Sequence, residues 1–349
     1  MYWRVMSENP QAAVHSQAVV RRSGGTGRHR SSVALLAVSA IAVAQFLLVL
    51  MFAWSSSRAG PRNLPFAVAG PAQTARGLAH VLNISQPGAF AVTVLSDDEA
   101  ARAAVIDRQV YGAVSLSGAG ARLYTASEAS PSVAQLLTQA VPAAMARVLP
   151  HVAVVIVDLA PNPVDDPKGT AIPTALIPLT MTSIAAGAVI GLLLGDRRKQ
   201  LAALLGYAVL AGVFVTLALQ GMIGGLTGSW FSNELVITLG AGSIAAVTCA
   251  LATLAGIAGI LVTLLVAWFF GFAFSGATTA WQLMPAPWGH IAQYLPVGAA
   301  NTGLRSVAFF DGAGASGPLL VLGAWALAGL ALTMLRHRAT QVAVPADIN

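Results

Sequence analysis

Long apolar runs alternate along this chain with one extended segment of mixed polarity. A helix of about 20 apolar residues crosses the hydrocarbon core of a bilayer. Six runs have about that length: residues 33–54, 172–194, 201–223, 235–255, 258–280 and 318–335. The pattern therefore predicts an α-helical polytopic membrane protein with six transmembrane helices.

The first run has two interpretations. Residues 33–54 contain no charged side chain over 22 residues, and Gln45 is the only strongly polar one. A cleaved signal peptide is the alternative, but its apolar core usually has only about 7 to 15 residues. We therefore favour an uncleaved first span, with Trp54 at the outer interface, where tryptophan is enriched.

Residues 55–171 have the pattern of a soluble domain, and they carry eight basic and eight acidic side chains. Strand-like runs alternate in this segment with helical patterns, and two of the strands, separated by a short glycine-containing turn, predict a hairpin. The predicted strands are 64–69, 90–95, 110–116, 122–126 and 152–159, and the predicted helices are 73–82, 97–109 and 131–149. We expect an extracytoplasmic α/β domain inserted between transmembrane helices 1 and 2.

Residues 281–317, between the last two runs, fit neither class. Proline, tryptophan and tyrosine interrupt this segment too often for a simple span, yet it is too apolar for an ordinary loop. We expect a re-entrant-like element on the outer face, partly sunk in the membrane.

Composition and charge position support this topology. The chain is 56% hydrophobic and only 9% charged, which excludes an ordinary soluble globular protein. Basic residues concentrate in a tail (1–32), in a short loop (197–199) and in a second tail (336–349), and short basic segments are usually cytoplasmic. We therefore expect a multi-pass protein of a prokaryotic plasma membrane with both termini in the cytoplasm. The net charge of +6 does not indicate nucleic acid, because it is not pooled on one folded surface.

Motifs for chemistry are lacking in this sequence. It has no GxxxxGK[ST], HExxH or GxSxG motif, its six histidines are scattered, and its single cysteine, Cys249, lies in an apolar run. We predict no enzyme activity, no cofactor and no metal site. The apolar runs have no ionisable group deep inside them, which argues against an ion-coupled carrier, so active transport would need energy from another chain.

Two groups of residues are candidates for contacts. Gly187, Gly191 and Gly195 recur every four residues and predict close helix packing, within the chain or between two copies. Asp196, Arg197, Arg198 and Lys199 form a short charged loop. The loop is either a topology anchor or a contact for a cytoplasmic ATPase.

Several short motifs carry a resemblance to a known family. They are Ser275-Gly276, Leu283-Met284-Pro285, Tyr294-Leu295-Pro296-Val297-Gly298 and Leu304-Arg305, together with Val110–Ala113, Leu123–Ser127, Pro131–Gln135 and Asp165–Gly169 in the predicted outer domain. In order and spacing they resemble the permease subunits of ABC-2 type exporters, specifically the YhgE/Pip branch. The resemblance covers roughly residues 33–336.

This resemblance implies a function and partners. It implies a permease that exports an amphipathic or lipid-like substrate, acts as a homodimer or paralogue heterodimer within membrane lipids, and uses a separate nucleotide-binding subunit. Its outer gate would comprise Ser275, Gly276, Pro285, Pro296, Gly298 and Arg305.

Two alternatives stay open. The chain could instead be a membrane-anchored interaction, assembly or receptor protein that acts through its outer domain. For Arg305 we expect a structural pair with Asp311 or Glu234, or an interface anchor on lipid phosphate, rather than substrate recognition.

Overall fold

The computed structural model describes residues 24–117 and 120–341 in two compact units, one ending at Ala53 and one beginning at Trp54. The first unit is the greater part of helix α2 (Gly24–Ser57), which contains an apolar span. Helix α2 includes residues 24–32 of the predicted cytoplasmic tail, whose first 23 residues lie outside the described chain. Of the second predicted tail, residues 336–341 continue the last helix and the rest lie outside it.

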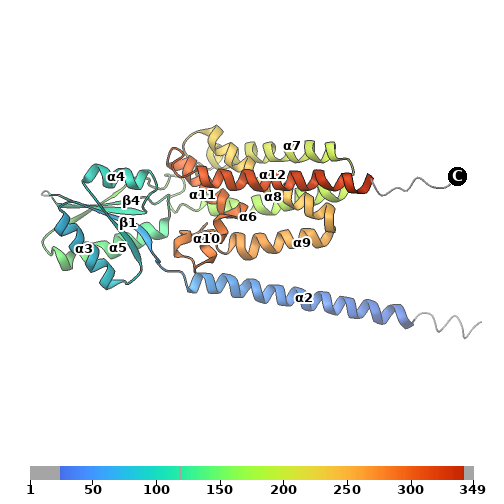
Figure 1. Cartoon of the computed structure of the whole chain (residues 1–349), viewed down its shortest axis with the longest axis horizontal. Helices are drawn as coiled ribbons and strands as arrows, with labels where there is room; N and C mark the ends of the chain where they lie inside the picture. The colour runs from blue at the N-terminus through green and yellow to red at the C-terminus, as the bar shows by residue number, and fades with distance from the viewer. Residues whose placement is uncertain (1–23, 118–119, 342–349) are drawn as a thin grey trace, which may run out of the picture. The chain divides into compact units, whose positions relative to one another are not determined.

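The second unit begins with an α/β part built on a mixed five-stranded sheet (Figure 1). Its strands are β1 (Leu64–Ala69), β2 (Phe90–Leu95), β3 (Gly112–Ser117), β4 (Gly120–Thr125) and β5 (Val154–Asp158). The order is β2-β1-β3-β4-β5, and only the β3–β4 hairpin is antiparallel. All five predicted strands are present.

Helices cover both faces of this sheet. Helices α3 (Ala72–Ser85) and α5 (Pro131–Val148) enclose one core with β1 and β3, whereas α4 (Asp98–Ile106) packs on the opposite face. Local chemistry sets where two of them begin. The Asp97 side chain accepts a hydrogen bond from the Ala100 amide at 2.8 Å, and Ser130 caps α5 in the same way.

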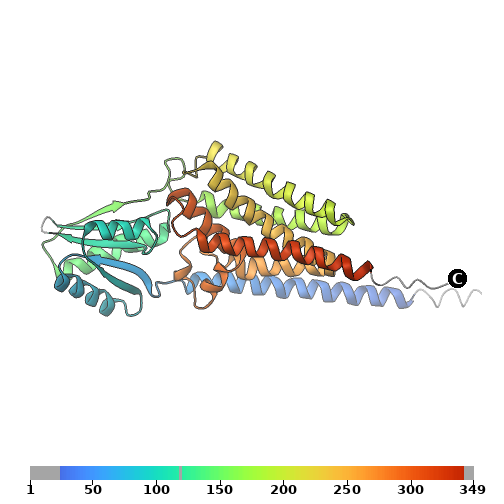
Figure 2. The ribbon, with the colours of Figure 1, turned by 45° about the horizontal axis from the view of Figure 1, so that its top comes forward.

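Apolar helices continue the second unit away from the sheet (Figure 2). They are α6 (Ala171–Leu193), α7 (Arg197–Thr216) with a π-helical turn (Leu217–Met222), α8 (Trp230–Ala255), α9 (Ile257–Val266) with a π-helical turn (Ala267–Phe272), and α12 (Ser316–Gln341). Including α2, five described helices are long and apolar enough to cross a membrane. This is consistent with a polytopic membrane protein.

Helix α8 is the centre of this bundle and packs against α6, α7, α11 and α12. Close approach depends on glycines of the neighbouring helices. A Cβ atom on Gly191 of α6 would lie 2.7 Å from the Cys249 carbonyl oxygen, and one on Gly329 of α12 would lie 2.6 Å from the Ala246 carbonyl carbon. Small residues bring membrane helices together in this way.

The end predicted for the fifth span, 258–280, is wrong. Helix α9 has ten residues, its π-helical turn adds six, and the helix stops at Phe272. At about 1.5 Å per residue this segment is about 24 Å long, shorter than a hydrocarbon core of about 30 Å. The chain turns because Gly276 adopts a φ of +73° and the Ser275 hydroxyl accepts a hydrogen bond from the Ala277 amide. A sixth span thus stays a prediction.

Residues 273–315, here called the junction segment, connect the α/β part with the bundle (Figure 1). The segment contains a 3₁₀ turn (Trp281–Leu283), α10 (Trp288–Gln293) and α11 (Pro296–Phe309). Its Leu283 joins the sheet core on one face, and its Phe310 joins the core on the other. Since α11 also packs on α8 and α12, this segment fixes the sheet to the bundle.

Candidate functional site

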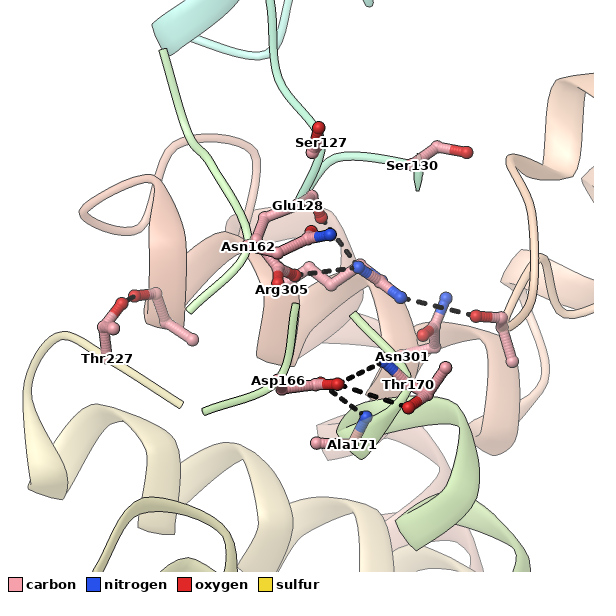
Figure 3. A network of polar contacts seen from close by, with 12 residues as sticks. Ser127, Glu128, Ser130, Asn162, Asp166, Thr170, Ala171, Thr227, Asn301 and Arg305 are labelled. Atoms are coloured by element: carbon pink, nitrogen blue, oxygen red, sulfur yellow. Dashed lines mark hydrogen bonds and ion pairs between the residues drawn. The ribbon is translucent and has the colours of Figure 1, made fainter. Parts of the chain in front are cut away.

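A buried ion pair joins the α/β part to α11. Arg305 is only 3% exposed, and its Nη1 donates to the Glu128 carbonyl oxygen at 2.8 Å and to Glu128 Oε2 at 3.1 Å (Figure 3). Its Nη2 also donates to the Ala277 carbonyl oxygen at 3.4 Å. The predicted pairing with Asp311 or Glu234 is therefore wrong, because the fold brings Glu128 to Arg305 from a loop 177 residues away.

A second arginine stabilises the same interface from the sheet side. Arg108, just beyond α4, has a left-handed φ of 58° and donates to Ser306 Oγ at 2.6 Å and to the Thr302 carbonyl oxygen at 3.2 Å. Its guanidinium lies 5.0 Å from the ring centroid of Phe310. The two arginines thus connect α11 to the α/β part.

The predicted motif Asp165–Gly169 ends at the start of α6. Asp166 is buried, and its carboxylate accepts from the Thr170 amide at 3.0 Å and from the Ala171 amide at 2.7 Å (Figure 3). A carboxylate at this position satisfies orphan amides and complements the helix dipole. The motif therefore fixes where α6 leaves the α/β part.

Burial governs the charge of Glu128. It raises the pKa of this carboxyl from 4.5 to about 7, with Arg305 opposing the rise and Asp166 and Asp158 adding to it. Only one of its two oxygens has a hydrogen-bond donor among the described residues, because Oε1 has none. The ion pair therefore changes its charge state near neutral pH.

We predict that the protein loses stability as pH rises from 5 to 8. The raised pKa means that the folded state holds a proton on Glu128 that the unfolded state has released, so this contribution is complete below pH 4.5 and is lost as pH passes about 7. The loss is on the order of 3 kcal/mol at most. Thermal unfolding in detergent should show it, and Glu128→Gln should flatten that part of the profile. If stability fell with pH to the same extent in wild type and Glu128→Gln, Glu128 would not be the cause.

A cavity of about 650 Å³ lies between α6 and the end of α7. Asp165 and Asp166 line one part of it, and threonines and apolar side chains line the rest. Besides the two acids, its lining comprises Thr170, Ala171, Thr174, Ala175, Pro178, Leu179, Thr182, Phe214, Val215, Ala218, Leu219 and Ile223. The cavity is thus acidic near the sheet and mainly apolar along the two helices.

Two departures from α-helical geometry border this cavity. Pro178 lies within α6 and has no N–H to donate to the carbonyl of Thr174. On the other side, the π-helical turn places Ala218 and Leu219 in the lining, and the Ile223 amide donates to the Ala218 carbonyl at 2.9 Å. Single π turns are frequent at functional sites.

A second cavity, of about 240 Å³, lies between α8, α9 and α12 and is lined almost wholly by apolar groups. It is bordered by the other π-helical turn, through Ala267 and Gly271, and by Pro296 and Trp325. The Trp325 indole donates to the Tyr294 carbonyl oxygen at 2.7 Å. The same geometric element, a π turn, therefore borders both cavities.

The predicted gate residues belong to one folded element. Ser275 and Gly298 are buried, and a Cβ on Gly276 would lie 2.7 Å from the Trp281 amide nitrogen. Pro285 is buried before α10, and Pro296 begins α11 and lines the apolar cavity. The structure thus brings these residues into the junction segment, where Arg305 is held by Glu128; a gating role stays a prediction.

The predicted charged loop begins a helix at the other end of the bundle. Asp196 caps α7, and hydrogen bonds from the Lys199 and Arg198 amides lower the pKa of its carboxyl. Arg198 and Lys199 are exposed in the first turn of α7, while Arg197 is half-buried. Gly195 lies beyond the end of α6 with open space around it, unlike Gly187 and Gly191.

Comparisons with known protein families, curated proteins and solved structures give no match for this chain. Within the described residues, no group of three or more His, Cys, Asp or Glu side chains could hold a metal ion. Sequence reasoning missed Glu128, Arg108 and the cavity wall of α7. The one local signal of the cavity was Pro178, a proline inside a predicted span.

Proposed function

We propose that this chain is the membrane permease subunit of an ABC-2 type exporter and moves an amphipathic or lipid-like substrate with energy from a separate ATPase. The observation that carries this proposal is the cavity between α6 and α7. Its volume of about 650 Å³ is within the range of roughly 300–1,000 Å³ typical of small-molecule sites. An acidic end and an apolar body suit a molecule with a polar head and a hydrocarbon tail.

The position of the basic residues supports a particular orientation of the chain in the membrane. Arg197, Arg198 and Lys199 lie at the end of the bundle opposite the sheet, which favours a cytoplasmic location for that end. The α/β part would then be outside the cell. The exposed Arg198 and Lys199 offer a docking point for the ATPase, and a second copy or a paralogue would complete the pathway.

We expect a variant with Arg197, Arg198 and Lys199 all changed to Gln to lose at least about tenfold of ATP-dependent export, since it removes charged contacts to the ATPase. The measurement is export by inverted vesicles from native cells that carry the variant. A matched control changes three exposed arginines of the sheet-side helices, Arg76, Arg102 and Arg147, to Gln and should export normally.

Topology needs its own control, because basic residues also orient membrane proteins. Val164 is 94% exposed on the sheet side, whereas Cys249 is buried. Val164→Cys should react equally with an impermeant maleimide in both triple variants. Normal export by the Arg197, Arg198 and Lys199 variant, with unchanged labelling, would contradict ATPase docking at this turn.

The alternative, an interaction or receptor protein that acts through the α/β part, has one observation in its favour. Strand β5 is at an edge of the sheet and exposes Val155 and Ile156. Exposed edges can pair with a strand of another protein. Ile156→Lys should abolish function in this alternative and leave export intact in the first. Deleting residues 60–165 would not separate the two, because it removes Glu128 from Arg305.

A further inference from the structure

We infer that the cavity between α6 and α7 binds a single-chain cationic amphiphile, with its ammonium group at Asp165 and its hydrocarbon chain along Pro178 and Phe214. This inference rests on the proposed function, since it names the chemical class of the exported substrate. It is carried by the distribution of hydrogen-bond acceptors and donors around the cavity.

The two acids in the lining differ in their capacity to bind a cation. Asp166 already accepts three hydrogen bonds, from the amides of Thr170 and Ala171 and from the Thr170 hydroxyl. Asp165 is exposed and has no hydrogen bond or ion pair to any residue that the structure describes. Its side chain lies against Gly224, since a Cβ on that glycine would lie 2.6 Å from Asp165 Oδ2.

Below Asp165, the cavity also presents backbone oxygen acceptors that favour a cation. Pro178 supplies no N–H to the Thr174 carbonyl, and both residues line the cavity. Two of the three lining threonine hydroxyls are engaged: the Thr182 hydroxyl donates to the Pro178 carbonyl oxygen at 2.8 Å, and the Thr170 hydroxyl donates to Asp166 Oδ1 at 3.2 Å. An ammonium group meets the Asp165 carboxylate and backbone acceptors here, whereas a sulfate or phosphate would meet that carboxylate and only the Thr174 hydroxyl as a side-chain donor that is not already engaged within the described residues.

Neither Arg305 nor Lys168 forms an ion pair with Asp165. Arg305 is occupied by Glu128 and by backbone oxygens. Lys168 is exposed and does not line the cavity. A bound ammonium group would therefore form the charge pair that Asp165 lacks within the described chain.

The depth of the cavity suits one alkyl chain. Its lining extends along α6 from Ala171 to Thr182, which is eleven helical rises or about 17 Å. On the other wall Phe214 and Ile223 border it, and both are at least half exposed. A chain entering from Asp165 would thus reach about halfway across the bilayer.

Photolabelling tests this inference on the full-length protein in a neutral detergent. The probe is a primary alkylamine with a diazirine in its chain, and mass spectrometry locates the label. We expect labelling within residues 170–182 and 214–223. Asp165→Asn should weaken it about tenfold, the effect of losing one charge-assisted hydrogen bond. Asp311→Asn removes an exposed acid outside the cavity lining and should label normally.

Matched probes and a second variant complete the test. A diazirine alkanol should label wild type and Asp165→Asn equally, an alkyl sulfate should label neither segment, and phosphatidylethanolamine should not compete with the amine. Phe214→Ala should weaken binding of a long-chain amine more than that of a short-chain amine. Labelling that is unchanged in Asp165→Asn, or equal with the sulfate probe, would overturn the inference.

Vesicle measurements separate this inference from the proposed function. If the amine labels the cavity in an Asp165-dependent manner but ATP drives no movement of it, the binding site stands and export fails. If ATP drives export of other amphiphiles while amine labelling does not depend on Asp165, export stands and the inference on its substrate class is overturned.

Discussion

Arg305→Met is expected to lower the free energy of unfolding by about 3–5 kcal/mol, the usual cost of breaking a buried ion pair. Removing the guanidinium leaves the Glu128 carboxyl and the carbonyls of Glu128 and Ala277 without their donor in a buried site. The loss should appear as a lower unfolding temperature and as earlier proteolysis between the sheet and the bundle.

A double variant separates the charge from the packing. Arg305→Met with Glu128→Met replaces both charges by apolar side chains of similar length and should recover most of the stability. Glu128→Met alone should lower the free energy of unfolding more than Arg305→Met alone, because it leaves a buried arginine cation. If Arg305→Met unfolds like wild type but no longer exports substrate, Arg305 is a transport residue and its structural role is refuted.

Gly187→Leu should have the second large effect. A Cβ on Gly187 would collide with the Ala245 carbonyl oxygen and would lie 2.7 Å from Thr248 Cβ, so α6 and α8 must move apart. Overpacking of this kind costs typically about 1–3 kcal/mol, and the whole side chain has no space to turn into. Denaturant or thermal unfolding in detergent measures it.

A glycine in open space provides the control. Gly206, within α7, has no atom within 4 Å of the position that a Cβ would occupy, so Gly206→Ala should be neutral or should stabilise by up to about 1 kcal/mol. The oligomeric state distinguishes the two interpretations of Gly187, Gly191 and Gly195, which are packing within the chain and packing between two copies. If Gly187→Leu separated a dimer without lowering the unfolding temperature, packing on α8 within one chain would be contradicted.

The α/β part could be predicted from sequence because its signals are local. Short apolar runs give β1 and β2, and the Asp97 cap and Pro131 at the first turn of α5 give two helix starts. Each feature depends on residues within a few positions of one another. The bounds of β1 and β2 match the predicted strands residue for residue.

The site could not be predicted in the same way, because its contacts are distant in sequence. Arg305 and Glu128 are 177 residues apart, and Arg108 lies 198 residues from Ser306. The partners predicted for Arg305, Asp311 and Glu234, were therefore wrong. The end of α9 was missed for a related reason: hydropathy stays high beyond Phe272, but the backbone turns at Gly276.

The cavity illustrates a third limit of sequence reasoning. Pro178 indicates a defect in one helix, but a π-helical turn in α7 has no comparably simple signature. The lining of the cavity combines the two, with Pro178 on α6 and Ala218 and Leu219 of the π-helical turn. Only the packing of α6 beside α7 shows that the acidic end and the apolar body of the cavity belong to one site.

Uptake of a labelled long-chain alkylamine by inverted vesicles from native cells measures export of the proposed amphipathic substrate. We expect ATP-dependent accumulation that disappears when the chain is deleted, returns with the wild-type chain, and returns only weakly with Asp165→Asn. Equal accumulation with and without the chain, or accumulation independent of ATP, would contradict it.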